Sequence, residues 1–280
     1  MSMLPADHEF EFTDSEFRRL RELVHARTGI ALSEAKRELV YGRLARRLRK
    51  LNLASFAEYC QLVERAQSDE LQELTNAITT NLTSFFRENY HFEQLASRAL
   101  PELESERMPT RRLRLWSAGC STGEEPYSLA VVMRECLAHL SNWDIKMLAT
   151  DIDSKVVAAA AEGIYAEERF KGVSAERIRN WFPQLPAQPG FRAASAELKA
   201  LVTFKQLNLL EPWPMKGPFD VIFCRNVVIY FDKPTQRALF DRMADLQRPG
   251  DWLFIGHSEN LHNITHRYKL VGRTVYRRLE

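Results

Sequence analysis

The chain lacks the features of a disulfide-rich, zinc-binding or membrane-spanning protein. Its cysteines, Cys60, Cys120, Cys136 and Cys224, are scattered without a C-x-x-C pair, so neither a disulfide framework nor a zinc ribbon is expected. The histidines form no H-E-x-x-H motif, and we predict that no metal is bound. No apolar run approaches the roughly 18 residues of a membrane span. The N-terminus MSMLPADHEFEF also lacks the basic and apolar regions of a signal peptide, so we expect a cytoplasmic protein without membrane insertion.

What is present is the composition of a soluble globular protein. The 280 residues are 45% hydrophobic and 27% charged, with a net charge of +2. This length can hold one small and one larger folded unit. Nothing in the sequence requires more than a monomer.

The first part of the chain is predicted to be almost wholly helical. Thr13 and Glu16 form a capping-box pattern, and Gly29 ends the helix that follows. Ser33 begins a second helix. Two further helices are predicted over residues 55–66 and 69–81.

Positive charge is concentrated in residues 36–50, KRELVYGRLARRLRK, where Glu38 is the single acid. The leucines recur at helical spacing, so one stripe packs inward and the remainder forms a positive ridge. A solvated helix face is the ordinary interpretation of such a run. Because so many cations on one short helix repel one another, we favour a docking surface for an acidic protein helix or a phosphate backbone. Whether a regulatory adaptor occupies this ridge stays open.

Residues 113–128, LRLWSAGCSTGEEPYS, are the most informative segment of the chain. A buried-strand pattern leads into a turn containing Gly119 and Gly123, and a helix follows, as in nucleotide-binding units. The Ser-Thr pair between these glycines can cap that helix. Glu124 and Glu125 stand at its head, where a phosphate would ordinarily be bound by free N–H groups. Their negative charge disfavours phosphate and suits a cofactor that carries hydroxyls and a cation.

A second acidic residue follows the next predicted strand. In IKMLATDID, residues 145–153, Asp151 lies at the position that reaches the ribose in doubly wound sheets. A helix cap is the structural alternative for this aspartate. The glycine loop, the glutamate pair and Asp151 together predict S-adenosylmethionine, whose sulfonium is positive and whose ribose needs acceptors. The missing G-x-G-x-x-G disfavours a nicotinamide oxidoreductase.

Beyond this loop, strands and helices alternate, which predicts an α/β fold with a Rossmann-like sheet. Strands are predicted over 113–118, 146–150, 219–224 and 252–255, and helices over 155–162, 174–182 and 235–247. We expect a loop over 101–112, an inserted β-subdomain over 183–206 and a hairpin over 268–277. The predicted domains are an all-α docking domain, residues 1–87, and a methyltransferase domain, residues 88–280.

Six motifs in order resemble the chemotaxis-receptor glutamate methyltransferases of the CheR type, and the resemblance covers nearly the whole chain. They are TNLTSFFRE, WSAGCSTGEEPYS, ATDID, NLLE, FDVIFCRNVVIYFD and GHSEN. The resemblance implies transfer of a methyl group from S-adenosylmethionine to glutamates on the cytoplasmic helices of chemoreceptors. The products are then a glutamyl methyl ester and S-adenosylhomocysteine. It also implies that Arg43, Arg46, Arg47 and Arg49 dock the receptor.

The resemblance further implies roles for individual residues. Arg87 would orient the incoming glutamate, and Tyr230 would assist near the sulfonium. The residues expected to contact the cofactor are Asn81, Thr83, Arg87, Gly119, Glu125, Asp151, Asn208, Leu209, Asn226 and Val227. The choice of Glu125 over Glu124 stays open. The proline-rich segment 183–190 departs from the glycine-rich loop associated with a receptor tether peptide, so tether binding is not predicted.

Two alternative functions come from other classes of protein. A methyltransferase acting on a nucleic-acid base commonly carries an Asn/Asp-Pro-Pro-aromatic motif, where this chain has Arg225, Asn226, Val227 and Val228; we therefore expect no nucleic-acid partner. A module that binds receptors without catalysis is the other alternative, and only an assay of methyl transfer distinguishes it.

Overall fold

The computed structural model describes residues 8–65, 69–139 and 141–280, and the chain divides into two compact units. The first unit ends at Thr80 and also includes Tyr230–Asp232, and the second holds the remainder. The division falls before Asn81, earlier than the predicted boundary after residue 87. The reason is that Asn81 is bound to the second unit: its Nδ2 donates to Asp153 Oδ2 at 2.8 Å, and Ser121 Oγ donates to its carbonyl at 2.9 Å.

The first unit is all helical, as predicted. The capping box of Thr13 and Glu16 is present at the start of α1, and Gly29 ends this helix at φ 71°. Ser33 makes no side-chain cap bond; a short 3-10 turn precedes the basic helix instead. The elements are α1 (Asp14–Thr28), η1 (Glu34–Lys36), α2 (Arg37–Leu51), α3 (Phe56–Glu64) and α4 (Asp69–Ile78). Their apolar faces meet in one core that includes Phe17, Leu44 and Phe56.

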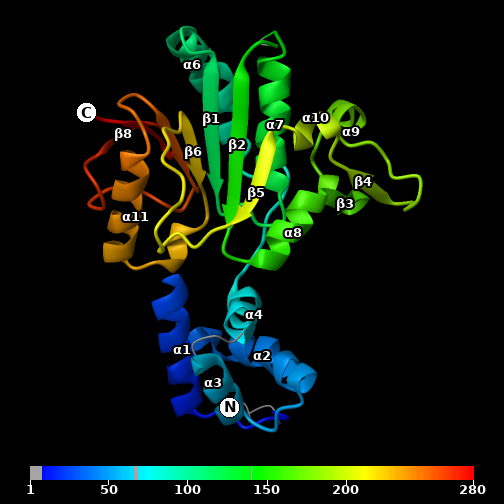
Figure 1. The fold of residues 1–280 in the computed structure, drawn as a ribbon, viewed down its shortest axis with the longest axis vertical. Helices are drawn as coiled ribbons and strands as arrows, with labels where there is room; N and C mark the ends of the chain where they lie inside the picture. The colour runs from blue at the N-terminus through cyan, green and yellow to red at the C-terminus, as the bar shows by residue number, and fades with distance from the viewer. Residues whose placement is uncertain (1–7, 66–68, 140) are drawn as a thin grey trace, which may run out of the picture. The chain divides into compact units, whose positions relative to one another are not determined.

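The second unit is built on a seven-stranded sheet of order β5-β2-β1-β6-β7-β9-β8. Strands β5, β2, β1, β6 and β7 are parallel, β9 is antiparallel to β7, and β8 is antiparallel to β9. Figure 1 shows β1 and β2 side by side, with β5 beside β2 and β6 on the other side of β1. The bounds are β1 (Arg112–Ala118), β2 (Asp144–Asp151), β5 (Val202–Gln206), β6 (Val221–Cys224), β7 (Trp252–Ile255), β8 (Tyr268–Gly272) and β9 (Val275–Arg278). The Rossmann-like sheet and the closing hairpin are therefore confirmed.

Helices cover this sheet, and one predicted loop is helical. Helix α6 continues to Arg107, so the expectation of a loop over 101–112 was wrong for most of its length. Pro101 directly follows a π-helical turn, Leu95–Ala99, inside a continuous helical run, and local π-type geometry of this kind accommodates a residue that lacks an N–H. The helical elements are α5 (Tyr90–Gln94), the π-helical turn η2 (Leu95–Ala99), α6 (Leu100–Arg107), α7 (Glu124–Cys136), α8 (Ser154–Glu162), η3 (Glu167–Phe170), α9 (Ala175–Trp181), α10 (Ala196–Lys199), η4 (Val228–Tyr230) and α11 (Lys233–Asp245).

The small β excursion exists, but its predicted limits were wrong. A separate two-stranded sheet pairs β3 (Ile164–Ala166) with β4 (Phe191–Ala193), so one of its strands lies before residue 183. Strand β5, which the prediction placed in the insertion, pairs with β2 in the main sheet. Burial distinguishes the two strands: Val202 of β5 packs in the core of the main sheet, whereas Phe191 of β4 stays partly exposed. Figure 1 shows β3, β4 and α9 beyond β5, away from α11.

The strand order fixes where a ligand fits. After β1 the chain crosses to β2 and β5 on one side, and then to β6 and β7 on the other. In such sheets, the crevice outside the carboxyl ends of the strands at this reversal is where ligands bind. The turns after β1, β2, β5 and β6 therefore form the candidate site.

Candidate active site

The sequence-predicted cofactor residues of the sheet gather at this carboxyl edge. Gly119 directly follows β1, and Asp151 is the last residue of β2. Asn208 follows β5, and Asn226 follows β6. Segments far apart in the chain thus converge at one edge because parallel strands end there together.

The turn after β1 requires a glycine at residue 119. Gly119 has φ +100°, a conformation that other residues rarely adopt, and its N–H donates to the Thr150 carbonyl at 2.8 Å. A Cβ at this position would lie 2.3 Å from Cγ2 of Val227. The Val227 side chain after β6 therefore packs directly against Gly119, and residue 119 has no room for a side chain of its own. The expected Ser or Thr cap of the next helix was wrong: Gly123 is the N-cap of α7, without a side-chain cap bond.

The side chain of Asp151 accepts hydrogen bonds from the turn after β1 and from the residues that follow β2. Its Oδ2 accepts from Ser121 N–H at 2.8 Å and its Oδ1 from Asp153 N–H at 3.1 Å. Burial raises the pKa of this carboxyl, although the backbone donors of Asp153 and Ser121 oppose the rise. Asp151 does not cap α8, because the side chain of Asp153 does so. The helix-cap alternative for Asp151 is therefore excluded, and its half-buried carboxylate is left as an acceptor at the edge.

The two glutamates at the head of α7 do not form a free negative surface. Glu124 is fully buried and pairs with Arg169, whose Nε donates to it at 2.9 Å. Glu125 accepts from Ser117 Oγ at 2.8 Å and from Arg225 at 3.0 Å. Each carboxylate thus has an internal cation, and the expectation that the pair repels phosphate by free charge was wrong. Burial raises the pKa of Glu125, against the influence of Arg225.

Arg225 is a central residue that the sequence reasoning did not single out. Its side chain is 1% exposed and pairs with Glu88 at 3.1 Å and with Glu125 at 3.0 Å. It also donates to the Arg87 carbonyl at 2.5 Å. One guanidinium therefore joins the segment before α5, the head of α7 and the end of β6. The sequence signal was an arginine directly after the continuous apolar strand VIFC, a place where a charge must be paired.

Glu88 is the most strongly engaged carboxylate of this network. His257 Nδ1 lies 2.6 Å from its Oε1, the His257 N–H donates at 3.0 Å, and Asn226 Nδ2 donates at 3.3 Å. Burial alone would raise the pKa of Glu88, but His257, Arg225 and Asn226 together lower it to about 2. Glu88 is therefore ionised at neutral pH.

The segment before α5 carries three further predicted residues. Asn81 is bound to Asp153, the residue that caps α8. Arg87 is half-buried, and its guanidinium donates to the Leu82 carbonyl at 2.8 Å. The carbonyl of Thr83 lies 3.4 Å from Arg169. Phe85 anchors the segment, because its ring stacks on Phe170 at 4.7 Å in the core.

Asn208 and Leu209 form a turn beyond β5. Asn208 Oδ1 accepts from Leu210 N–H at 3.0 Å, and its Nδ2 donates to Glu211 at 3.3 Å. Leu209 is 8% exposed, and its carbonyl accepts from Arg242 at 2.8 Å. The turn thus presents a half-buried amide beside an apolar side chain, the combination expected next to an adenine ring.

Two family matches cover the chain on either side of Thr80. Residues 81–277 match the domain described as CheR methyltransferase, SAM binding domain, and residues 15–79 match CheR methyltransferase, all-alpha domain. The chain belongs to the CheR methyltransferase family. These limits also place residues 81–87 with the cofactor-binding domain rather than with the helical one.

Three bacterial chemotaxis protein methyltransferases are similar to this chain over nearly their whole length. Chemotaxis protein methyltransferase 2 of Pseudomonas aeruginosa is 46% identical over 272 residues, which cover 96% of this chain and 95% of the relative. A probable chemotaxis protein methyltransferase of Rhizobium etli is 44% identical over 259 residues, covering 91% and 96%. The chemotaxis protein methyltransferase of Escherichia coli is 41% identical over 278 residues, covering 98% and 94%.

This CheR-family chain is a methyltransferase that uses S-adenosylmethionine, and its carboxyl edge fits that cofactor. At this edge Val227 packs directly against Gly119, and the carboxylate of Asp151 offers oxygen acceptors of the kind that ribose hydroxyls need. In residues 8–65, 69–139 and 141–280, no group of His, Cys, Asp and Glu side chains could hold a metal ion. The same described ranges contain no helix that is both long and apolar enough to cross a membrane.

Tyr230, the second predicted catalytic residue, belongs to the helical unit by its contacts. Its carbonyl accepts from Ala31 N–H at 3.0 Å, and Lys36 Nζ lies 5.0 Å from its ring centroid. The cation over this ring is therefore a lysine of the same unit. The role of Tyr230 beside the sulfonium stays a prediction.

The basic helix α2 uses two of its four predicted docking arginines internally. Arg43 donates to the carbonyls of residues 77, 78 and 79 at the end of α4. Arg47 is 13% exposed and pairs with Glu70 at 2.5 Å and with Glu73 at 2.7 Å. Arg46 and Arg49 are exposed, and Arg49 pairs with Glu9 at 2.9 Å.

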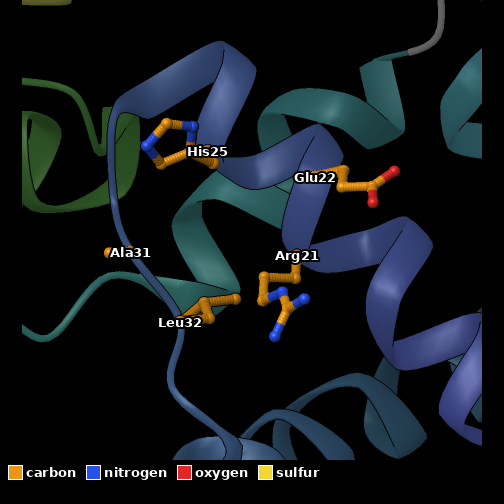
Figure 2. Close-up of a pocket in the computed structure, with 5 residues that line it drawn as sticks. All are labelled: Arg21, Glu22, His25, Ala31 and Leu32. Carbon is orange, nitrogen blue, oxygen red and sulfur yellow. The ribbon is translucent and has the colours of Figure 1, made fainter.

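The helical unit also contains a pocket of about 400 Å³, lined by Arg21, Glu22, His25, Ala31 and Leu32. Figure 2 shows Glu22 pointing away from Leu32. Arg21 is engaged with Glu34 at 3.1 Å. The charged and polar side chains of the lining, Arg21, Glu22 and His25, point in different directions and do not converge (Figure 2), so we assign the pocket no ligand.

Proposed function

We propose that this protein transfers the methyl group of S-adenosylmethionine to glutamate side chains on the cytoplasmic helices of chemoreceptors. The observation that carries the proposal is the convergence of Gly119, Asp151, Asn208 and Asn226 at one sheet edge, in a CheR-family chain. The expected products are a glutamyl methyl ester and S-adenosylhomocysteine. A cytoplasmic location follows, because that is where such receptor helices lie, and we expect a monomer.

Methyl-labelled cofactor and purified receptor fragments test this proposal directly. Label incorporated into the receptor should be released by mild base, because esters hydrolyse whereas methylated amines do not. Label that resists base would place the methyl on another acceptor. No incorporation, with cofactor binding intact, would make the protein a receptor-binding module.

The acceptor needs little activation. A glutamate carboxylate has an unperturbed pKa of about 4.3 and is ionised at neutral pH. The cofactor supplies an electrophilic methyl group on sulfonium, so a carboxylate oxygen bonds to the methyl carbon as the sulfur takes the electron pair of the broken bond. Proton transfer is not required, and the protein acts by positioning, which contributes up to about 7–11 kcal/mol.

Arg87 is the residue we assign to the acceptor. Its planar fork can bind one edge of a carboxylate and leave the other oxygen facing the methyl group. The carbonyl of Leu82 already orients this guanidinium, and Arg225 donates a hydrogen bond to the backbone carbonyl of Arg87. Because Glu88 lies next to Arg87 and is satisfied by Arg225 and His257, it does not compete for the fork.

Substitution of Arg87 separates orientation from cofactor binding. For Arg87→Ala, kcat for receptor methylation should fall about 100-fold, as expected when a reacting group is misplaced. The dissociation constant for S-adenosylhomocysteine should change much less. Arg87→Lys keeps the charge without the fork and should recover only part of the rate. Near-normal turnover of Arg87→Ala would remove this residue from the mechanism.

Receptor docking is assigned to the exposed part of α2. Arg46 and Arg49 are exposed, Lys50 lies beside them, and a Cβ at Gly42 would meet nothing within 4 Å. A helix rich in glutamate complements this surface in charge and can approach closely at Gly42. Arg43 and Arg47 support the surface by holding α4, so their replacement would disturb the fold as well as docking.

Charge reversal tests this surface. The double variant Arg46→Glu/Arg49→Glu should lower the methylation rate about tenfold at low salt, and the difference should shrink as salt rises. Arg18→Glu/Arg27→Glu, at two exposed arginines of α1, is the control with the same change in net charge. Cofactor affinity should be unchanged in both variants. Equal rates for the α2 variant and the control would show that α2 has an ordinary solvated face.

A further inference from the structure

Glu259 lies beyond the carboxyl end of β7, and its carboxylate is fully used by backbone donors. Its Oε1 accepts from the N–H groups of Val227 and Val228, both at 3.0 Å. Its Oε2 accepts from Asn226 N–H at 3.0 Å and from Gly256 N–H at 2.5 Å. A carboxylate offers about four acceptor sites, so all of them are occupied. The side chain is 5% exposed, which keeps water from substituting for it.

These bonds determine the shape of the segment after β6. Asn226 is held at φ +59°, in the left-handed region, which asparagine tolerates better than most residues. Three successive N–H groups of one turn converge on Glu259, as in a backbone anion nest. Without the carboxylate, the same N–H groups would be left without acceptors in a buried place.

The segment held in this way touches two other parts of the site. The side chain of Val227 fills the space beside Gly119, where a Cβ would lie 2.3 Å from its Cγ2. Asn226 Nδ2 donates to Glu88 at 3.3 Å. The turn after β7 also packs closely against Asn226: a Cβ added at Gly256 would lie 2.6 Å from Asn226 Nδ2. A shift of residues 226–228 would therefore change the turn after β1 and the segment that carries Arg87.

We propose that Glu259 is a positioning residue for S-adenosylmethionine, which acts by holding Asn226 and Val227 in the shape that the cofactor binds. It touches the backbone of these residues and is not itself a catalytic residue. The proposal rests on cofactor binding at this edge and is independent of the receptor substrate. Glu259, the buried acid of the GHSEN segment, therefore affects the affinity for the cofactor.

The test compares two buried carboxylates that flank β7. Glu259→Gln replaces one carboxylate oxygen by an NH₂ group. That NH₂ group would face two of the four backbone N–H groups, and neither could accept a hydrogen bond from the other. Asp251→Asn is the matched control: Asp251 is buried before β7, accepts from Arg248 N–H at 2.6 Å and pairs with Arg107 at 2.5 Å. Both variants should lower the melting temperature of the full-length protein, followed by tryptophan fluorescence.

Only Glu259→Gln should weaken binding of S-adenosylhomocysteine, by about tenfold or more in titration calorimetry, and raise KM for S-adenosylmethionine more than it lowers kcat. Asp251→Asn should bind the product like the wild type. Equal affinities for the two variants, at comparable losses in melting temperature, would overturn the proposal. If the wild type itself failed to bind S-adenosylhomocysteine, the cofactor assignment would fail instead.

A measurement on the unmodified protein covers the case in which Glu259→Gln does not fold. Amide hydrogen exchange by NMR should show the N–H groups of residues 226–228 protected in the cofactor-free protein, because Glu259 already binds them. Addition of S-adenosylhomocysteine should increase this protection by less than tenfold. Rapid exchange before binding, followed by strong protection after it, would mean that the ligand and not Glu259 shapes the segment.

Discussion

Replacement of Glu88 by glutamine should change how the stability of the second unit depends on pH. In the folded protein, His257, Arg225 and Asn226 lower the pKa of Glu88 to about 2 against the opposing effect of burial, from an ordinary value of 4.5. The side chain is 11% exposed, so solvent screens these partners only weakly. Glutamine has nearly the same shape and can still accept hydrogen bonds, but it carries no charge and cannot titrate.

The magnitude follows from the difference between the two pKa values. The folded protein binds this proton less tightly than the unfolded chain, so the contribution is complete above about pH 5 and is lost as the pH falls towards 2. A shift of roughly 2.5 units corresponds to about 3 kcal/mol of unfolding free energy. Of this, about 2 kcal/mol should disappear between pH 5 and pH 3.

Tryptophan fluorescence makes the measurement specific for the second unit. All five tryptophans of the chain, at positions 116, 143, 181, 213 and 252, lie in that unit. Urea unfolding followed at their emission therefore reports this unit without a signal from the helical one. The free energy of unfolding of the wild type and of Glu88→Gln would be determined at intervals from pH 7 to pH 3.

The wild type should exceed Glu88→Gln by about 3 kcal/mol at pH 7, and the difference should shrink towards pH 3. Taking the difference cancels titrating groups that lie away from Glu88. His91 does not cancel: burial and Arg225 lower its pKa to about 3 while Glu88 opposes them, so His91 contributes to the difference near pH 3. Glu93→Gln, at an exposed carboxylate of α5, is the control and should give a nearly constant difference. A constant difference for Glu88→Gln would refute the assignment of Glu88 as an ion-paired carboxylate.

Two further substitutions test the site and its support. Gly119→Ala should weaken S-adenosylhomocysteine binding at least tenfold in calorimetry. The new Cβ would lie 2.3 Å from Val227, and alanine is strained at φ +100°. Unchanged affinity would show that the turn after β1 does not contact the cofactor. Arg47→Ala should destabilise the helical unit by about 3–5 kcal/mol in denaturation followed by circular dichroism, because it leaves Glu70 buried without its cation. Arg46→Ala on the same helix should stay within about 0.5 kcal/mol of the wild type, and similar losses for both variants would contradict the division between buried and exposed arginines.

Local patterns were sufficient to predict most of the helices and strands. The capping box at Thr13 and the glycine at residue 29 predicted the limits of α1, because both depend on interactions within a few residues. The apolar run before Gly119 predicted β1, because this pattern also lies within a few neighbouring residues. Segment 101–112 was misjudged because its charge and prolines are typical of loops, whereas packing of Leu103 in the core keeps it helical.

The extent of the small β-subdomain depended on pairing over a long distance. Nothing near residues 183–206 indicates that β4 pairs with Ile164–Ala166 or that β5 belongs beside β2. Strand pairing of this kind joins residues that are remote in the chain, so the sequence pattern shows a strand without showing its neighbour.

The sequence by itself determined the α/β class, the glycine turn after β1 and the aspartate at the end of β2, since each is a local requirement of backbone conformation or strand periodicity. Only the tertiary structure decided which charges are paired. Glu125 meets Arg225, one hundred positions further along the chain, and Glu259 meets the N–H groups of residues 226–228, because parallel strands bring their carboxyl ends to one edge. Whether a charge is free to bind a ligand therefore depends on neighbours that folding supplies, and a list of acidic and basic residues does not contain them.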